Sequence, residues 1–329
     1  MAEIAAARKP AAGLQGVVVA DSEISYVDGQ AGHLVYRGYS IEDLAANSTF
    51  EETAKLLLDG TLPSRAELDQ FDAELIGARG LGGEIIELIR AYPVDAQPMA
   101  VLRTAVSALG LFDPDTKDIG SEATRRKAIR LVAKFPTIVA AFERHRNGHD
   151  PIGPRGDLGH AANFLYMLNG SEPDPEDARV MDVCLILHAE HGMNASTFSA
   201  RVTAATLSDI HSAITSAVGT LKGALHGGAN QEVMKMLLEI DQRGIEPADQ
   251  ILETMAAEKG IDPNVDFFSA STYHALGIPT DLFTPIFAIS RVSGWSTHVE
   301  AQYRHNRLIR PRAKYVGPRD LTYVPIEKR

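Results

Sequence analysis

Apolar residues recur at the spacing of an α-helix along most of the chain. The stretch 208–221 is the clearest case, because its apolar residues repeat with the 3.6-residue period of one helix face. They are Ile210, Ala213, Ile214, Ala217, Val218 and Leu221. The same kind of pattern predicts helices at 51–58, 65–78, 83–91, 121–146, 158–168, 180–191, 231–240, 248–259, 271–276 and 284–303. Pro136 predicts a break or kink in the segment 121–146. The pattern therefore predicts an all-α fold.

The exception is the N-terminal stretch 16–38, which is typical of β-structure. Runs of β-favouring residues at 17–19 and 24–26 precede an Asp-Gly pair, and a third run returns at 34–36. Asp-Gly between such runs predicts a β-hairpin. Beyond it, residues 40–43, 48–51 and 64–67 each resemble a capping box and predict helix starts.

Composition narrows the class of protein. Of the 329 residues, 45% are hydrophobic and 23% are charged, the profile of a folded globular protein. The net charge of −11 disfavours nucleic acid and anionic membranes as partners, and the basic stretch 304–314 lacks the interleaved aromatics of a nucleic-acid site. No apolar run approaches the ~20 residues that span a membrane. Residues 1–13 lack the apolar core of a signal peptide, and Cys184 is the only cysteine, so a cytoplasmic location is expected.

The stretch 223–234 carries the strongest chemical signal. His226 stands between Gly223 and the pair Gly227-Gly228, directly before the expected first turn of a helix. The glycines allow close approach of a ligand, and the positive end of a helix dipole favours neutral imidazole. Neutral imidazole donates a hydrogen bond to a carbonyl oxygen that gains negative charge, as in enolate chemistry. For this stretch alone, a glycine-rich turn whose histidine merely caps a helix is equally open.

Two charged residues stand in apolar surroundings. Asp266 is followed by two aromatic residues. An apolar setting raises the basicity of a carboxylate, as a general base requires. The alternative is that Asp266 caps the N-terminus of a helix. Arg291 needs an anionic partner, for which its planar guanidinium suits carboxylates. His188 and His191 lack the spacing of the His-Glu-x-x-His zinc motif, so no metal site is expected.

Several separated motifs, in order along the chain, carry a family resemblance. They are Tyr-Arg-Gly-Tyr at 36–39, His-Ala-Ala-Asn-Phe at 160–164, His-Ala-Glu-His-Gly-Met-Asn-Ala-Ser-Thr at 188–197, Leu-His-Gly-Gly-Ala-Asn at 225–230, Pro-Asn-Val-Asp-Phe at 263–267 and Ser-Arg-Val-Ser-Gly-Trp at 290–295. From about Gly13 to Gly317 the chain resembles the citrate synthase family, which includes the 2-methylcitrate synthases. Because the resemblance starts so near the first residue, no additional regulatory domain is expected before it.

The resemblance implies an acyltransferase of the tricarboxylic acid cycle with an almost all-α, two-domain fold. It implies a homodimer or larger homo-oligomer that closes over oxaloacetate and acetyl-CoA, with no cofactor and no metal. The large domain would comprise residues 1–222 and 278–329, and the small domain residues 223–277.

The resemblance also implies roles for individual residues. His226 would hydrogen-bond the thioester oxygen while Asp266 removes the methyl proton in a Claisen condensation. His191 and Arg291 would hold oxaloacetate, and Arg310 would reach a substrate carboxylate from the partner subunit. The thioester of the product would then be hydrolysed.

One segment departs from the family pattern. Between His226 and Asp266 the family has several dozen further residues with a second catalytic histidine and a substrate-binding arginine. Here residues 227–265 contain no histidine, and Arg243 is their only arginine. Either the sequence lacks a part of the small domain that the natural chain has, or the shortening is genuine. A genuine shortening would indicate a non-catalytic dimeric scaffold or a dicarboxylate-binding relative.

The intact His226 and Asp266 favour an enzyme. Within that class, a 2-methylcitrate synthase using propionyl-CoA stays open, because one methylene is worth only ~1–3 kcal/mol of discrimination.

Overall fold

The computed structural model describes residues 12–14, 16–242 and 265–329, which divide into two units. One unit spans residues 23–308 and holds the β-strands and α-helices described below. The other comprises residues 1–22 and 309–329, and its described part contains the short 3₁₀ helices η1 (Ala12–Leu14) and η3 (Ile326–Lys328).

Helices make up most of the unit 23–308, as predicted. The strands are β1 (Ser25–Asp28), β2 (His33–Tyr36) and β3 (Tyr39–Ser40). The helices are α1 (Ile41–Asn47), α2 (Phe50–Asp59), α3 (Arg65–Ala78), α4 (Gly83–Arg90), α5 (Pro98–Phe112), α6 (Ser121–Arg146), α7 (His160–Asn169), α8 (Pro175–His188), α9 (Ala195–Ala204), α10 (Ile210–Leu221), α11 (Ala229–Gln242), α13 (Val265–Ala275), the 3₁₀ helix η2 (Thr280–Leu282) and α14 (Phe283–Arg304). The helix predicted at 248–259 lies outside the described residues.

The N-terminal hairpin is confirmed. β1 and β2 pair antiparallel with Ser25 opposite Tyr36, and β3 pairs with the other edge of β2. Asp28 closes the turn by accepting two backbone N–H groups on Oδ1, both at 3.0 Å. The predicted run at 17–19 is not a strand, because its side chains are exposed and no strand in the described part of the chain pairs with it.

Two helix starts follow the predicted caps, and a third is shifted. Ser64 and Glu67 form the reciprocal capping box of α3. The start predicted at 48–51 is displaced by one residue, so that Thr49 caps α2. Ser48 is buried, and its hydroxyl lies 3.1 Å from the hydroxyl of Thr53, which leaves the capping position to its neighbour.

Two helix predictions differ from the structure. The predicted segment is not broken at Pro136, because α6 continues through this buried proline as one helix, and α6 packs against α3, α5 and α14. This burial outweighs the hydrogen bond that proline cannot donate. The helix predicted at 271–276 begins earlier, because α13 spans Val265–Ala275.

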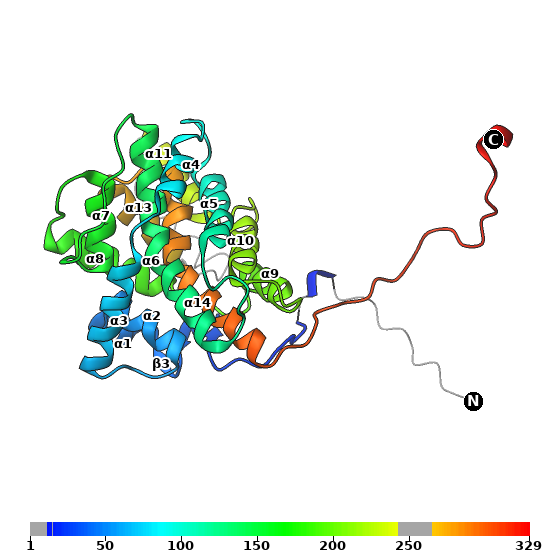
Figure 1. Cartoon of the computed structure of the whole chain (residues 1–329), viewed down its shortest axis with the longest axis horizontal. Coiled ribbons are helices and arrows are strands. Elements are labelled where there is room, and N and C mark those ends of the chain that lie inside the picture. Colours follow the sequence, from blue (N-terminus) through cyan, green and yellow to red (C-terminus); the bar gives the residue numbers. More distant parts are fainter. Residues whose placement is uncertain (1–11, 15, 243–264) are drawn as a thin grey trace. The chain divides into compact units, whose positions relative to one another are not determined.

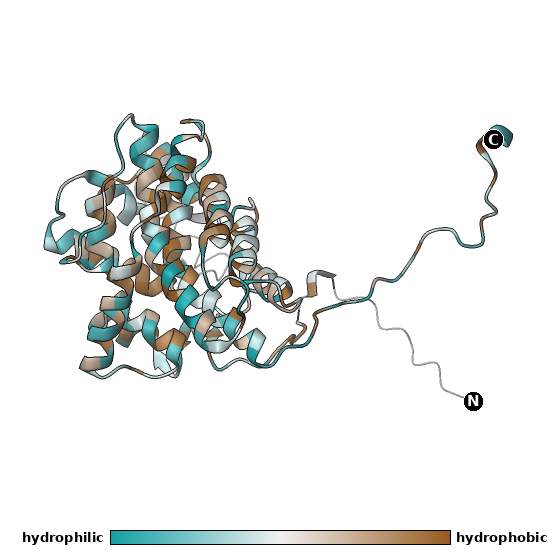
Figure 2. Ribbon diagram, viewed as in Figure 1, coloured by the Kyte–Doolittle hydropathy of each residue, from teal (hydrophilic) through white to brown (hydrophobic). Residues whose placement is uncertain are grey.

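α14 is the central element of the unit 23–308. It is buried along most of its length and packs against α2, α6, α8, α9 and α10 (Figure 1). Apolar residues gather on these inner helices, whereas hydrophilic ones cover the outer faces (Figure 2). No helix in the described part of the chain is both long and apolar enough to cross a bilayer. The boundaries of a large and a small domain at residues 223 and 278 stay a prediction.

Candidate active site

His226 lies in the turn that joins α10 to α11. The N–H of Gly227 donates to the carbonyl of Leu221 (3.0 Å), and a Cβ on Gly227 would stand 2.2 Å from that oxygen. Only glycine therefore allows this close approach of two backbone segments. The carbonyl of Gly227 accepts a hydrogen bond from Thr284 Oγ1 (2.8 Å) near the start of α14. The turn is thus fixed to two helices, and His226 precedes α11, which begins at Ala229.

The imidazole of His226 is half-buried and contacts one buried hydroxyl. Its Nε2 lies 2.7 Å from Oγ of Ser196, which is fully buried in the first turn of α9. Burial and the charge of Arg291 lower the pKa of His226, so the imidazole is neutral near pH 7. When the serine hydroxyl donates to Nε2, the ring proton sits on Nδ1 and is available to a substrate. Ser196 lies within the family motif at 188–197, but no role was predicted for it.

Asp266 is the second residue of α13, so it lies inside the helix rather than at the N-cap position. Its side chain is partly buried, and burial raises the pKa of Asp266 while the charge of Arg291 opposes the rise. Of the two aromatics that follow, Phe268 is 54% exposed, so it contributes little to this desolvation. The raised basicity that the sequence suggested is therefore present.

Arg291 occupies the centre of the site. It is 3% exposed, its Nε donates to the carbonyl of His188 (2.6 Å), and its guanidinium lies over the ring of Phe287 at 4.4 Å. Burial lowers the pKa of Arg291, and the charges of Glu190 and Asp266 act in the opposite direction. A buried guanidinium with few protein partners is a suitable receptor for a carboxylate.

His191 lies in the turn between α8 and α9. The helix predicted to reach His191 ends at His188 instead, which leaves His191 exposed. Partial desolvation and the charge of Arg291 lower the pKa of His191. His188 is fully buried with Nδ1 2.7 Å from the carbonyl of Cys184, and burial lowers the pKa of His188 to about 4. Of the two histidines, only His191 is therefore accessible to a substrate.

The structure thus places three of the other predicted site residues within reach of the charge of Arg291. Arg291 acts on His191, His226 and Asp266, and we call these four residues the Arg291 cluster. Arg310 is exposed and belongs to the other unit, so its role stays a prediction. Within the described residues, no group of three or more His, Cys, Asp or Glu side chains is placed to hold a metal ion.

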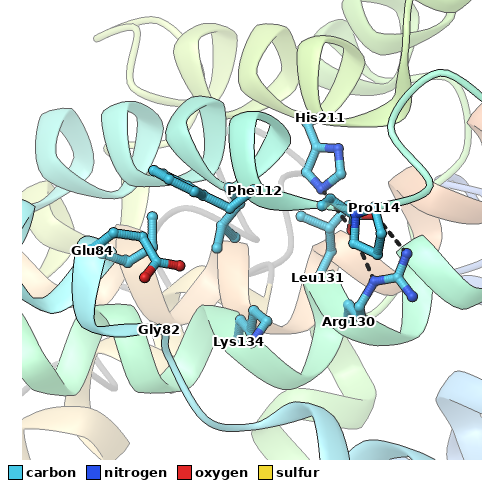
Figure 3. Close-up of a pocket in the computed structure, with 11 residues that line it drawn as sticks. Gly82, Glu84, Phe112, Pro114, Arg130, Leu131, Lys134 and His211 are labelled. Carbon is cyan, nitrogen blue, oxygen red and sulfur yellow. Dashed lines mark hydrogen bonds and ion pairs between the residues drawn. The ribbon is translucent and has the colours of Figure 1, made fainter.

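Another buried histidine, His211, lies in different surroundings, beside a pocket of about 210 Å³ between α4, α5, α6 and α10 (Figure 3). His211 Nε2 lies 3.5 Å from Asp113, which also accepts two hydrogen bonds from Arg130 (2.7 and 2.8 Å). Burial would lower the pKa of His211, but Asp113 and Asp209 outweigh it and raise that pKa. These residues, here called the His211 cluster, share no member with the Arg291 cluster.

A neutral imidazole, a carboxylate with a raised pKa and a buried arginine are the groups of an enzyme that removes a proton beside a carbonyl and binds an anion. Comparison with known proteins identifies the family. The family model for the citrate synthase C-terminal domain matches residues 13–257 and 244–312. The chain belongs to the citrate synthase family.

Individual relatives align with nearly the whole length of this chain. The citrate synthase of Haloferax volcanii is 45% identical over 372 residues, with 96% of this chain and 98% of that protein covered. The 2-methylcitrate synthase of Shewanella oneidensis is 40% identical, with 97% and 98% covered. Among solved structures, the citrate synthase of Pyrobaculum aerophilum superposes with a TM-score of 0.86 at 38% identity, covering 96% of this chain and 94% of that one. A ternary complex of citrate synthase from Thermoplasma acidophilum with carboxymethyl coenzyme A and oxaloacetate gives a TM-score of 0.89 at 28% identity, covering 96% and 98%.

Proposed function

We propose that the protein condenses acetyl-CoA with oxaloacetate to give citrate and CoA, with the Arg291 cluster as its active site. The observation that carries the proposal is the buried guanidinium of Arg291, which lies in electrostatic contact with a neutral imidazole and a basic carboxylate. The choice of acyl group rests on similarity. Relatives named citrate synthase are 43–45% identical, whereas those named 2-methylcitrate synthase are 37–40% identical.

Condensation begins with proton transfer from the methyl group of acetyl-CoA to Asp266. Its raised pKa brings the basicity of this carboxylate closer to neutral pH, as a general base requires. As the proton leaves, negative charge grows on the thioester oxygen, where the N–H of His226 donates a hydrogen bond. Ser196 holds the imidazole in the orientation and tautomer that this bond needs.

The enolate carbon attacks the ketone carbon of oxaloacetate, the π bond of the ketone breaks, and its oxygen takes up a proton to become the hydroxyl of the product. Arg291 and His191 hold the carboxylates of this substrate, and Arg310 adds a further cation from a partner subunit. Water then attacks the thioester carbonyl of the condensed product, and the CoA thiol leaves. The reaction needs no cofactor, because acetyl-CoA is itself a substrate.

The shortened segment bears directly on this mechanism. The alignment with the Haloferax volcanii protein spans 372 positions, whereas 96% of this 329-residue chain is about 316 residues, so roughly 56 aligned positions have no residue here. The family model also matches in two pieces that meet between residues 244 and 257. Both observations agree with a segment that is shorter here than in the relatives, at the place where the family carries its second histidine and arginine.

A second candidate is a dicarboxylate-binding protein without turnover. It is favoured by the absence of histidine from residues 227–265, because loss of the donor that polarises the ketone would cost about 10²–10³ in rate by analogy with oxyanion donors. In that protein Arg291 and His191 would still bind oxaloacetate.

The proposal includes a cytoplasmic homodimer. α10 carries small, partly exposed residues such as Ser212, Ser216 and Gly219, which permit close approach of another helix. Leu111, near the end of the neighbouring α5, is 82% exposed, as expected for an interface residue in an isolated protomer. Light scattering after size-exclusion chromatography tests this assembly, and a monomer would contradict it.

Release of thiol from acetyl-CoA in the presence of oxaloacetate tests the function directly. We expect turnover with acetyl-CoA and slower turnover with propionyl-CoA. Intact mass of the natural protein, compared with the 35.5 kDa of this chain, tests the segment. A mass several kilodaltons larger with turnover supports the enzyme; a mass of 35.5 kDa with oxaloacetate binding and no thiol release supports the binding protein.

A further inference from the structure

We propose that Glu190 and His298 form a buried positioning pair that holds the turn carrying His191 and so sets the affinity for oxaloacetate. The inference rests on the proposed function of the Arg291 cluster and extends it to residues that touch no substrate. Neither residue was singled out by the sequence pattern, and both are fully buried.

Glu190 precedes His191 and is held through both its backbone and its side chain. Its carbonyl accepts a hydrogen bond from the hydroxyl of Tyr36 (2.8 Å), and its N–H donates to the same oxygen (3.1 Å). Its Oε1 lies 2.9 Å from the donating hydroxyl of Ser25 and 3.0 Å from Nε2 of His298. Two strands and one helix therefore converge on the residue next to His191.

The residue that follows His191 is fixed by the same carboxylate. The N–H of Gly192 donates to Oε1 of Glu190 (2.5 Å) and lies 3.1 Å from the hydroxyl of Ser25. Gly192 has a φ of +63°, a conformation that favours glycine. Both neighbours of the exposed His191 are therefore anchored, which keeps its imidazole in one position before substrate arrives.

His298 has a single assignable tautomer. The guanidinium of Arg201 lies 3.4 Å from Nδ1 of His298 and can only donate, so Nδ1 accepts and the ring proton is on Nε2. Nε2–H then donates to Glu190. Arg201 in turn donates from Nε to Gln302 (3.0 Å), and all of these side chains are buried. The donor that Glu190 requires is thus set by a chain of hydrogen bonds through α9 and α14.

The pair also places a negative charge beside Arg291. Burial would raise the pKa of Glu190, but His298, Arg291 and the hydroxyl of Ser25 outweigh it, so the carboxylate is charged at neutral pH. Among the charges that act on Arg291, Glu190 has the largest effect. The backbone of α14 passes so close that a Cβ on Gly294 would stand 2.2 Å from Oε2 of Glu190. The pair therefore connects the two residues proposed to hold oxaloacetate.

A double-mutant cycle on the natural protein tests the pair. We expect His298→Leu to weaken oxaloacetate binding about tenfold, as the loss of outer partners of ligating residues commonly does. Binding is read from the fluorescence of Trp295, the only tryptophan, one helical turn beyond Arg291. His298→Gln supplies a donor and an acceptor at matching positions, and we expect it to restore binding to within about threefold of the wild type.

The cycle separates positioning from general stability. Because His298 is proposed to act through His191, His298→Leu in a His191→Ala background should leave oxaloacetate affinity unchanged. Equal, additive losses in both backgrounds would overturn the inference. The control is His211→Leu, which removes another buried histidine from a hydrogen-bonded ion cluster and should leave oxaloacetate affinity unchanged.

Hydrogen exchange distinguishes failure of this inference from failure of the proposed function. In the ligand-free protein the amide of Gly192 should be protected, and His298→Leu should abolish that protection while His211→Leu does not. If the wild-type protein shows this pattern of protection but binds no oxaloacetate, the proposed function is disproved and the positioning role of Glu190 and His298 stands. If His298→Leu leaves the protection at Gly192 unchanged, the positioning role is disproved, whatever the enzyme binds.

Discussion

The Arg291 cluster and the His211 cluster place histidines in opposite electrostatic settings. In the first, a buried arginine adds to the effect of desolvation and the pKa values of His191 and His226 fall. In the second, Asp113 and Asp209 outweigh desolvation and the pKa of His211 rises. Burial alone therefore does not decide whether a histidine in this protein is charged; the sign of its neighbours does.

This difference separates a reactive site from a structural one. A neutral imidazole donates to a carbonyl oxygen without adding a permanent cation, which suits stabilisation of an enolate. His211, whose pKa is raised by two aspartates, joins the end of α5 to the start of α10, beside the Arg130 ion pairs seen in Figure 3. The His211 cluster therefore serves as an internal control for experiments on the Arg291 cluster.

Asp266→Asn is expected to give the largest difference in kcat between variants of the two clusters. The amide cannot accept the methyl proton, so kcat should fall by about 10²–10⁴, the usual contribution of a general base. Oxaloacetate affinity should stay near that of the wild type, since Asp266 is not proposed to hold this substrate. Steady-state kinetics and Trp295 fluorescence measure the two quantities. Removing a carboxylate of the other cluster, with Asp209→Asn, should leave kcat unchanged, and an equal loss there would contradict the assignment.

His226→Phe should give the next largest effect. The ring keeps an aromatic shape but has no N–H for the thioester oxygen, so kcat should fall by about 10²–10³. Ser196→Ala, which removes only the hydroxyl that orients the imidazole, should lower kcat less. An effect of Ser196→Ala confined to stability, with kcat retained, would show that the serine does not select the tautomer.

Substitution of one glycine beside each cluster tests how tightly the surrounding backbone is packed. A Cβ on Gly227 would meet the carbonyl of Leu221 at 2.2 Å, whereas a Cβ on Gly110 would meet Cβ of His211 at 3.0 Å. Gly227→Ala must displace the backbone of the His226 turn, so we expect a loss of about 2 kcal/mol in unfolding free energy together with reduced kcat. Gly110→Ala should cost less stability and leave kcat unchanged. Urea titration and the thiol-release assay measure both, and the reverse order would contradict the packing described for the turn.

The sequence predicted the helical fold because periodicity records which face each helix buries. It failed where packing overrides a local signal: α6 is not broken at Pro136, and no strand in the described part of the chain pairs with the run at 17–19. For the site, the family motifs led to the residues proposed to touch substrate, whereas no role was predicted for Ser196, Glu190 or His298. Their roles depend on contacts between residues 30, 165 and 108 positions apart, which no local pattern encodes.

The smallest effect, and the most direct test of the comparison, is the pH dependence of stability. The pKa of His211 is raised in the folded state, so His211 stabilises the fold when it is protonated. This contribution to the free energy of unfolding is fully present below the pKa of histidine in the unfolded chain, near 6.5, and is lost as the pH rises through the pKa in the folded state. His211→Gln should therefore cost about 1 kcal/mol at pH 5.5 and less at pH 8.5. His226 has a lowered pKa, so the wild type loses stability as the pH falls below about 6.5, and His226→Gln should remove part of that loss. Urea unfolding at both pH values should show the two variants changing in opposite directions. If both changed in the same direction, the charges of Arg291 and of the two aspartates would not govern these histidines.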